Sequence, residues 1–478
     1  MCAAGDEYDV DELRARRICA DCVGEKYLKN IILTEGQDAT CDYCAASAKT
    51  FSIGELADYI DGAFEDHYIR TPEEPSGYEY ALAKENDGGW ERHGEPVEWA
   101  IANAADIDAA PAQDVQRILA DLYYDRYSEK VGEETEFSDG SYYESKDIDD
   151  YEFRLDWRFF EECVKGDIRH FNSKAESILE NIFGDFNQHT TRDAHTSVVT
   201  VGPDQEIKSF FRARVFQSSG ELLNALKYPD REIGPPPMHA ALPGRMNARG
   251  VSMFYGATGV KTAIAEVRPP VGSRVVVGRF DLLRPVQLLD VRALKDIYAE
   301  GSIFDQSYLE QLGRAKFLER LSERISKAVM PNDETLDYIV TQVIADYLAT
   351  RENPSLDGIL FSSPQQPNDG LNVVLFHKAS CVQVDVLPPG ATVDASDGFF
   401  NGDEYEFCYC VDEDVPSSSD EKKASIPTDF QNHFQDDLVN DIREPTLKLN
   451  TGDVCVHHID EIKYTTSSHK VTRIRRQK

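Results

Sequence analysis

Two groups of residues in the second half of the chain have the types and spacing to bind an anion. Arg212 and Arg214 lie two positions apart in "FFRARVF", so a β-strand would present both on one face. Arg245 and Asn247 follow a Pro-Gly turn, and the alternating segment after them reaches Tyr255. Guanidinium groups form paired hydrogen bonds to phosphate oxygens. The two groups therefore predict a local anion site that also carries an amide and a phenol.

A carboxylate and a pair of serines extend this pattern. Glu266 follows in "VKTAIAEV", and Ser362 and Ser363 end the strand-like "DGILFSS" before a loop rich in Gly, Pro and Asn. Singly, each has an ordinary explanation, because Glu266 lies off the apolar stripe of its helix and serines are common in turns. Their order along the chain favours a ligand that is anionic and carries a ribose.

The charge balance separates a local anion site from general binding of polyanions. The chain has 478 residues, with 50 basic and 86 acidic side chains and a formal net charge of -36. This field repels duplex nucleic acid and anionic membranes, so we expect no broad binding to nucleic acid and no membrane partner. No segment has the roughly 18 uncharged apolar residues of a membrane span, and the first residues lack the apolar core of a secretion signal. We therefore predict a cytoplasmic protein of several domains.

Four cysteines near the start of the chain have the spacing of a zinc site. Cys19 and Cys22 form one CxxC pair, and Cys41 and Cys44 form a second pair after 18 intervening residues. Two such turns supply the four thiolates of a tetrahedral zinc site. Because a closed four-cysteine site has no open position for a substrate, we expect structural zinc in a small knuckle at residues 1–50.

The elements around these residues change character near residue 205. Helical spacing of apolar residues dominates 51–200, apart from an acidic, turn-rich stretch at 132–150 that we expect to be an exposed loop. From 205 onward the pattern alternates as in strands, with helices between them, which predicts an α+β domain rather than a doubly wound sheet. The expected strands are 208–217, 251–258, 273–282, 285–291, 357–363, 371–378 and 380–388, and the expected helices are 258–267, 307–328 and 335–351.

The order of these motifs resembles the RES domain, a family named for its arginine, glutamate and serine. The resemblance covers about residues 205–390 and implies an ADP-ribosyltransferase-like fold, NAD+ as the substrate, and the role of the toxin in RES–Xre toxin–antitoxin pairs. The preceding helices resemble the HEPN-type domain of longer members, and a zinc knuckle is compatible with that arrangement. The expected domains are a zinc knuckle at 1–50, an all-α HEPN-like domain at 51–200, an α+β RES domain at 205–395, and an acidic extension with a short basic tail at 396–478.

The resemblance also assigns residues. The family's arginines, tyrosine, glutamate and serine correspond to Arg212 (with Arg214 as the register alternative), Arg245, Tyr255, Glu266 and Ser363 (with Ser362 one residue away). Where the family commonly has Trp-Asn, this chain has Met246-Asn247, which removes a stacking contact and keeps the polar residue.

Cleavage of the nicotinamide–ribose bond of NAD+ gives these residues roles. Positive charge develops on the ribose during cleavage, and Glu266 would stabilise it through a ribose hydroxyl. The acceptor would be water or inorganic phosphate, and no GxGxxG follows a strand to suggest redox use of NAD+. We expect Glu266, Arg212 and Ser363 to be catalytic. We expect the residues that hold NAD+ to be Arg212, Arg214, Arg245, Asn247, Tyr255 and Ser363.

Other functions remain open at this point. The same site would serve an ADP-ribosyltransferase that modifies a protein or nucleic acid. A HEPN ribonuclease is less favoured, because active members have Arg four to six residues before His, a spacing that neither Arg192–His195 nor Arg169–His170 has. The helices would instead support a homo-oligomer, and the N-terminal half would bind a neutralising antitoxin or a trigger. A weaker hypothesis is a second metal cluster, formed by Cys408, Cys410, Cys455, His457 and His458.

Overall fold

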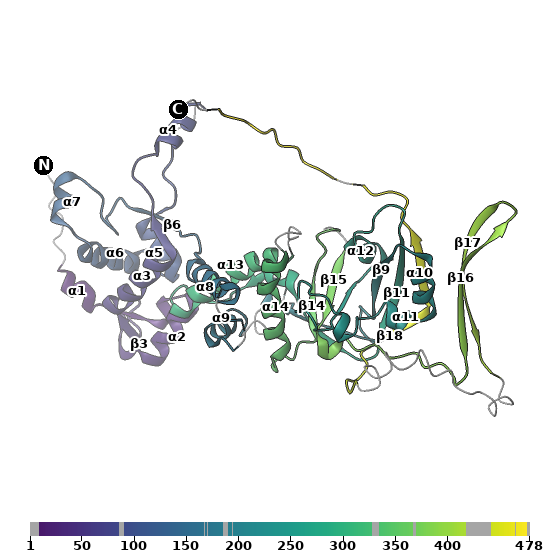
Figure 1. The fold of residues 1–478 in the computed structure, drawn as a ribbon. Helices are drawn as coiled ribbons and strands as arrows, with labels where there is room; N and C mark the ends of the chain where they lie inside the picture. The colour runs from purple at the N-terminus through teal and green to yellow at the C-terminus, as the bar shows by residue number, and fades with distance from the viewer. Residues whose placement is uncertain are drawn as a thin grey trace. The chain divides into compact units, whose positions relative to one another are not determined.

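The computed structural model divides the chain into two compact units (Figure 1). The first unit takes Met1–Phe153 and Tyr298–Phe317, and the second takes Arg154–Ile297 and Leu318–Lys478. No helix in the described part of the chain is both long and apolar enough to cross a membrane. The residues that the structure describes are 9–85, 90–166, 168–169, 171–184, 190–193, 195–326, 334–366, 370–416, 441–463 and 465–475.

The first unit is mainly helical, with two small antiparallel sheets. Its helices are α1 (Val10–Ala15), α2 (Lys26–Glu35), α3 (Ile53–His67), α4 (Gly77–Glu85), α5 (Val97–Ala105), α6 (Ala109–Leu122) and α7 (Arg126–Val131), with α8 (Tyr151–Gly166) beginning at its end. One sheet has the order β1 (Arg17–Cys19), β3 (Ser47–Ser52), β2 (Gln37–Thr40). The other has the order β4 (Tyr68–Arg70), β6 (Tyr142–Ser145), β5 (Glu95–Pro96).

One apolar core holds this unit together. Ile18 and Leu28 from the cysteine-rich region pack in the same cluster as Leu56, Ile60 and Ile118 from α3 and α6. Helix α3 starts where it does because the side chain of Ser52 accepts a hydrogen bond from the Glu55 amide, and Glu55 accepts one from the Ser52 amide. The cysteine-rich segment is thus built onto the helices by a shared core.

The prediction that 51–200 is all-α, with an exposed loop at 132–150, is wrong in part. Strand β6 lies within that loop, and residues 198–201 form strand β8 of the second unit. The ring of Tyr143 is buried against Phe64 and Phe137, with centroids 5.1 and 5.4 Å away. Its hydroxyl donates to Glu136, so a stretch rich in acidic and turn residues is anchored by aromatic packing that its composition conceals.

The second unit is built on one mixed sheet of eight strands. All neighbouring pairs are antiparallel except β12 and β14, which are parallel. The order is β18 (Leu447–His458), β11 (Arg274–Leu282), β9 (Ser209–Phe216), β10 (Phe254–Ala257), β15 (Leu371–Leu375), β14 (Gly358–Ser362), β12 (Val286–Asp290), β8 (Val198–Val201). This arrangement agrees with the α+β expectation.

Helices flank this sheet. Helix α12 (Val260–Glu266) lies against β9, and α10 (Ser219–Lys227) and α11 (Pro229–Glu232) follow β9 in the chain (Figure 1). Phe210, Phe254 and Phe280 pack on the sheet in one core with Leu222 of α10. The remaining helices are α9 (Ser173–Phe183), α13 (Gln306–Ser326) and α14 (Glu334–Thr350), and the short strands are β7 (Thr190–Thr191) and β13 (Ile297–Tyr298).

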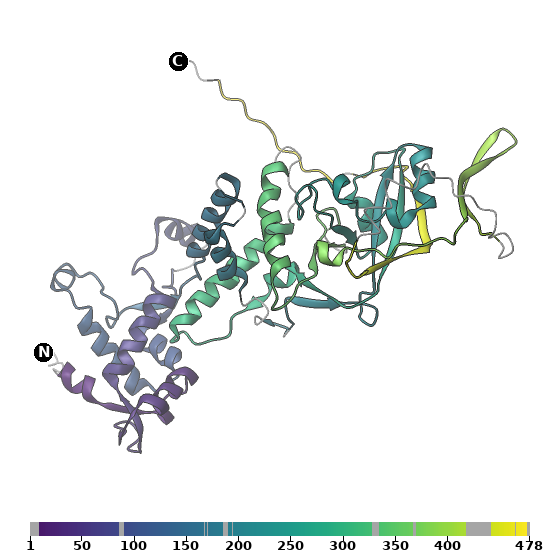
Figure 2. The same cartoon turned by 60° about the horizontal axis from the view of Figure 1, so that its bottom comes forward.

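The extension after residue 391 contains more regular structure than its acidic composition indicates. Strands β16 (Thr392–Asn401) and β17 (Glu404–Asp414) form a separate antiparallel hairpin, and β18 joins the edge of the eight-stranded sheet. The hairpin lies on the β18 side of the sheet in both views (Figures 1 and 2). The strand expected at 380–388 is wrong, because that segment makes only an isolated bridge from Val382 to Leu447.

Candidate functional site

A pocket opens where two central strands separate. β9 and β10 are neighbours in the sheet, but they pair only at Ala257 and Phe211. From that pair β9 continues against β11, while β10 continues against β15. The pocket beside this split has a volume of about 360 Å³. Its lining includes four residues expected at the site, namely Arg212, Arg214, Asn247 and Tyr255.

Arg212 of β9 forms a hydrogen bond to β10 across the split. Its Nε donates to the carbonyl oxygen of Ile233 at 2.8 Å, and its Nη1 donates to that of Tyr255 at 2.7 Å. Burial and, to a smaller extent, the nearby charge of Arg214 together lower the pKa of Arg212 to about 10. Because both acceptors are neutral carbonyls, the positive charge of Arg212 remains available to an anion in the pocket. Arg214 is exposed, and its Nη1 donates to the carbonyl oxygen of Glu232.

The Pro-Gly turn and the end of the following strand form one hydrogen-bonded unit. The Tyr255 hydroxyl donates to Oδ1 of Asn247 at 2.6 Å and accepts from the Met246 amide at 3.0 Å. Burial raises the pKa of Tyr255, so the phenol stays protonated and acts as this donor. Gly244 is required for this packing, since a Cβ there would lie 2.6 Å from Asn247 Oδ1 and 2.8 Å from the Tyr255 hydroxyl.

Helix α14 supports this turn from outside. The Gln342 amide donates to the carbonyl oxygens of Gly244 at 2.8 Å and Asn247 at 2.9 Å, and the Thr341 hydroxyl donates to that of Arg245. Neither Gln342 nor Thr341 was expected from the sequence. The sequence carries no signal for this contact, because the helix and the turn are nearly a hundred residues apart and the contact involves only backbone carbonyls of the turn.

Arg245 lies at the end of α13. Its Nη1 donates to the carbonyl oxygen of Ile325 at 2.6 Å. Burial lowers the pKa of Arg245, while Tyr338 and Glu266 act in the opposite direction. Arg245 is therefore close enough to feel the charge of Glu266, and it also donates to a helix carbonyl, but it is not among the residues that line the pocket.

Glu266 and Ser363 meet directly, from segments 97 residues apart. The Ser363 hydroxyl donates to Oε1 of Glu266, and the amide nitrogen of Asn372 donates to the same oxygen at 2.8 Å. Asn372 and Ser363 are 6% and 1% exposed, so both donors act in a dry environment. Since both bonds fall on Oε1, the carboxylate is oriented while Oε2 takes part in neither.

The register of the sheet explains how these groups come together. Asn372 pairs with Ala257 of β10 and with Phe361 of β14, and paired residues share a face of the sheet. Helix α12 carries Glu266 to that face and ends there, just before Arg268 and two prolines. Ser363 follows the last residue of β14, and its hydroxyl also accepts from the amides of Gln365 and Gln366 at 3.2 Å each. Ser362 lies within β14, paired with Leu371.

Asn372 is the functional candidate that sequence analysis missed. It lies in "LNVVLF", where one polar residue interrupts an apolar strand. Its Nδ2 reaches Glu266, but its Oδ1 is buried without a hydrogen-bond partner. A lone amide in an otherwise buried strand can indicate a functional residue in the sequence, because burying such a group without hydrogen-bond partners costs free energy.

The four cysteines of the N-terminal segment are arranged for a metal. Their Sγ atoms all lie within 4.8 Å of one another, with separations of 3.7 Å for Cys19–Cys22, 3.5 Å for Cys19–Cys44 and 3.8 Å for Cys22–Cys41. Zinc–sulfur bonds of about 2.3 Å in a tetrahedron require sulfur atoms about 3.8 Å apart, whereas a disulfide needs about 2.0 Å. The spacing therefore fits a four-thiolate zinc site.

The other metal and ribonuclease hypotheses lack support in the geometry. Among the described residues, those four cysteines are the one group of three or more side chains placed to share a metal. In the region of the suggested second cluster, His458 instead contacts the Tyr409 hydroxyl at 2.8 Å. Arg192 directly follows strand β7 and the amide of His195 donates to the Thr191 hydroxyl, so neither of the two lies on a helix, and His170 lies outside the described residues.

Comparison with known families identifies the region that contains most of these residues. Residues 214–396 match the model of the RES domain. The match includes Arg214, Arg245, Glu266 and Ser363, and it begins two residues after Arg212. No curated protein matches the chain. The matched region supports the RES family and, with it, an enzymatic activity related to NAD+; the cysteine site and the helices before residue 214 lie outside the match.

Proposed function

We propose that the protein cleaves the nicotinamide–ribose bond of NAD+ and passes the ADP-ribosyl group to water or inorganic phosphate. The observation that carries this proposal is the Glu266 carboxylate, held through Oε1 by Ser363 and Asn372. Oε2 of Glu266, which takes part in neither bond, can accept a hydrogen bond from a ribose hydroxyl. That bond strengthens as positive charge grows on the ribose, so it lowers the barrier rather than only binding the substrate.

The pocket beside the β9–β10 split supplies the complementary charge. Arg212 and Arg214 line it, and their hydrogen bonds go to neutral carbonyl oxygens. In a chain of net charge -36, two guanidiniums facing one pocket are a local exception that suits a pyrophosphate. Asn247 and Tyr255 line the same pocket, so the neutral part of a dinucleotide would meet an amide and a phenol there.

The test is chromatography of NAD+ incubated with the purified chain, with and without inorganic phosphate. We expect free nicotinamide with ADP-ribose or its 1-phosphate, and a rate at least about 100-fold lower for Glu266→Gln. Glu206→Gln, an exposed glutamate in the loop before β9, is the matched control and should retain the activity. NAD+ that remains intact with the wild-type chain under all these conditions would refute the proposal.

Transfer to a macromolecule is the alternative that uses the same site. ADP-ribose attached to an added protein or nucleic acid, with little free ADP-ribose, would favour a transferase over the hydrolase or phosphorylase.

We further propose that the protein acts in the cytoplasm. There it would deplete NAD+ and so arrest the growth of the cell that produces it. In that role the N-terminal half would bind a neutralising partner or trigger, and the cysteine site would hold structural zinc. Expression of the wild-type chain and of Glu266→Gln, with NAD+ measured in both cultures, tests this role.

A further inference from the structure

The side chain of Gln342 in α14 holds both ends of the Pro-Gly turn. Its amide nitrogen donates to the carbonyl oxygen of Gly244 at 2.8 Å and to that of Asn247 at 2.9 Å. The turn is closed by the Gly244 amide, which donates to the same carbonyl of Asn247 at 3.0 Å. A glutamine side chain has two N–H donors, so both are used on this turn. Gln342 therefore ties the turn to α14 at two points.

Asn247 links this turn to the wall of the pocket beside the β9–β10 split. Its side chain is buried, and its amide nitrogen donates to the carbonyl oxygens of Leu242 at 3.0 Å and Val251 at 2.9 Å. Its Oδ1 accepts from the Tyr255 hydroxyl at 2.6 Å. Gly244 and these four residues all line the pocket. A displacement of the turn would therefore displace a whole wall of the pocket.

The carboxylate at the centre of the proposed chemistry depends on other elements. Glu266 ends α12, and Ser363 after β14 and Asn372 in β15 hold it. The side chain of Gln342 bonds instead to the turn before β10. A change at Gln342 should therefore alter the binding of a ligand in the pocket and leave the step at the ribose largely unaffected.

The opposite side of α14 is fastened to α9. Tyr347 lies five residues after Gln342, so their side chains point about 140° apart around the helix axis. The Tyr347 hydroxyl donates to the Glu180 carboxylate of α9. Arg351, just after α14, donates to the same carboxylate at 3.1 Å and to the carbonyl oxygen of Gly184 at 2.7 Å. Helix α14 thus lies between α9 and the sheet that carries the pocket, as both views show (Figures 1 and 2).

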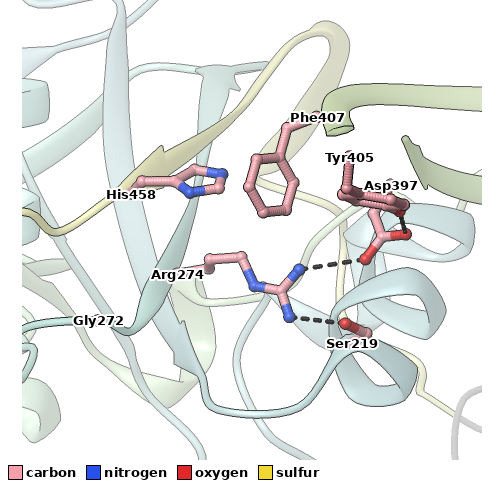
Figure 3. A pocket seen from close by; sticks show the side chains of 7 residues that line it. All are labelled: Ser219, Gly272, Arg274, Asp397, Tyr405, Phe407 and His458. Carbon is pink, nitrogen blue, oxygen red and sulfur yellow. Dashed lines mark hydrogen bonds and ion pairs between the residues drawn. The ribbon is translucent and has the colours of Figure 1, made fainter. Parts of the chain in front are cut away.

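A second pocket, of about 440 Å³, gives a contrast in charge. Its aromatic wall consists of the rings of Tyr405, Phe407 and His458 (Figure 3). Its guanidinium, that of Arg274, bonds to Asp397 at 3.2 Å and to the Ser219 hydroxyl at 2.8 Å. Because Asp397 neutralises Arg274, this pocket offers a pyrophosphate less charge than Arg212 offers with its bonds to neutral carbonyls. A nucleotide bound here would depend on Arg274 and not on Gln342, which makes Arg274 a control.

We propose that Gln342 is a positioning residue for NAD+, and that α9 sets the affinity of the pocket through it. This role rests on the proposed function, since NAD+ is the ligand that is positioned. By holding the turn in place, Gln342 removes the need to order it when the dinucleotide binds. When α14 is loosened from α9, a smaller share of molecules has the turn in place, and the apparent affinity for NAD+ falls by the same factor.

Isothermal titration calorimetry of NAD+ with Glu266→Gln measures binding in the absence of turnover. In this background Gln342→Met keeps the length of the side chain, removes both donors, and should raise Kd roughly tenfold. Gln311→Met is the matched control, because the Gln311 amide bonds to Ser307 of its own helix. That variant and Arg274→Met should bind NAD+ as the background does. Circular dichroism of each variant checks that the fold is intact.

Replacing Arg351 tests the contribution of α9. Arg351→Met removes the bonds to Glu180 and Gly184 and should raise Kd about threefold. It should have no further effect once Gln342→Met is present, because Gln342 then no longer ties the turn to α14, and this non-additivity is what a shared route predicts. Glu176→Gln changes an exposed residue one turn before Glu180, so it is the control and should bind as the background does.

Steady-state kinetics separate positioning from loss of the fold. In the otherwise wild-type chain Gln342→Met should raise KM roughly tenfold and leave kcat within about twofold, whereas unfolded molecules lower the apparent kcat and leave KM unchanged. The proposal is overturned if Gln342→Met binds NAD+ within about twofold of its background, or if its kcat falls while KM stays constant. It is also overturned if Arg274→Met weakens binding, or if the effects of Arg351→Met and Gln342→Met add. NAD+ that binds but is not cleaved by the wild-type chain would refute the proposed cleavage and leave the positioning role standing, while absence of binding would refute both.

Discussion

Replacing Asn372 by aspartate tests whether this residue orients the Glu266 carboxylate. The two side chains have nearly the same shape, so the change introduces no cavity. In the variant an oxygen replaces the Nδ2 that lies 2.8 Å from Oε1 of Glu266, and two carboxylates then face each other. The structure predicts a penalty whose size depends on pH, because the pair can escape repulsion by binding one proton.

The expected magnitude follows from the distance. Two full charges 2.8 Å apart repel by about 6 kcal/mol at an effective dielectric constant of roughly 20. Binding a proton at pH 7 to a carboxyl with an unfolded pKa of about 3.9 costs about 4 kcal/mol, which is less. The folded variant should therefore bind one proton, and its free energy of unfolding should fall by about 4 kcal/mol at pH 7 and about 1.5 kcal/mol at pH 5.

The sign of the pH dependence is fixed by the direction of the shift. The folded pKa of the carboxyl pair is raised above the unfolded value, so the stability of the variant is retained below about pH 4 and lost as pH rises toward the folded pKa. Across this window the difference from wild type should grow by about 1.4 kcal/mol per pH unit. Subtracting the wild type at each pH removes the contributions of the other titrating groups.

Urea unfolding at pH 5, 6, 7 and 8 measures this difference. Asn372→Ala is the control: it loses one hydrogen bond to a carboxylate, about 1.5–3 kcal/mol, but adds no charge, so its penalty should be nearly the same at every pH. The reasoning is refuted if the penalty of Asn372→Asp is also independent of pH, because the two carboxylates would then not be in contact.

Three further predictions concern the site and the cysteine cluster. Ser363→Ala should lower the rate of NAD+ cleavage by about tenfold to 100-fold, because it removes a hydrogen-bond donor to Glu266. Ser362→Ala is the control and should cleave NAD+ at nearly the wild-type rate. Initial rates of nicotinamide release measure the two variants. Tyr255→Phe removes the hydroxyl that bonds the Met246 amide and Asn247 Oδ1, which costs about 1–3 kcal/mol of stability for each group left without a partner. The melting temperature should therefore fall in a thermal melt, and an unchanged value would contradict these two bonds. Cys41→Ser should lose the single zinc ion expected per chain in native mass spectrometry and lower the melting temperature of the first unit, and a chelator should do the same to the wild type.

The local features of the fold were predictable from sequence, because they depend on neighbours in the chain. The strands β9, β11 and β15 lie within the expected ranges, because each is a short run rich in β-branched, aromatic or other apolar residues. The two CxxC pairs likewise carry their geometry in their spacing, and their sulfur atoms converge. Each of these predictions needed only a short window of sequence.

Features that depend on distant segments were not predictable in this way. Strand β18 reads "LKLNTGDVCVHH", with polar residues interrupting the alternation, and it is ordered by pairing with β11, more than 160 residues earlier. The acidic hairpin is similar: Tyr405, Phe407 and Tyr409 alternate along β17, but Phe400 joins them only because the pairing of β16 with β17 puts it across from Tyr405. Composition identified this region as acidic and missed the surface that it forms.

The three polar residues of the central site show where sequence reasoning stops. Helical phase puts Glu266 on the outside of α12, and a seven-residue helix has too few turns for phase to decide what its last residue touches. The chain order of the motifs selected Glu266, but only the register of β10, β15 and β14 shows that Asn372 and Ser363 both reach Oε1. Arg245 is the converse: its motif position suggests the pyrophosphate, yet its guanidinium donates to the end of α13. Arg245 has further N–H donors for a phosphate, but it does not line the pocket as Arg212 does, so its contribution to NAD+ affinity should be smaller than that of Arg212.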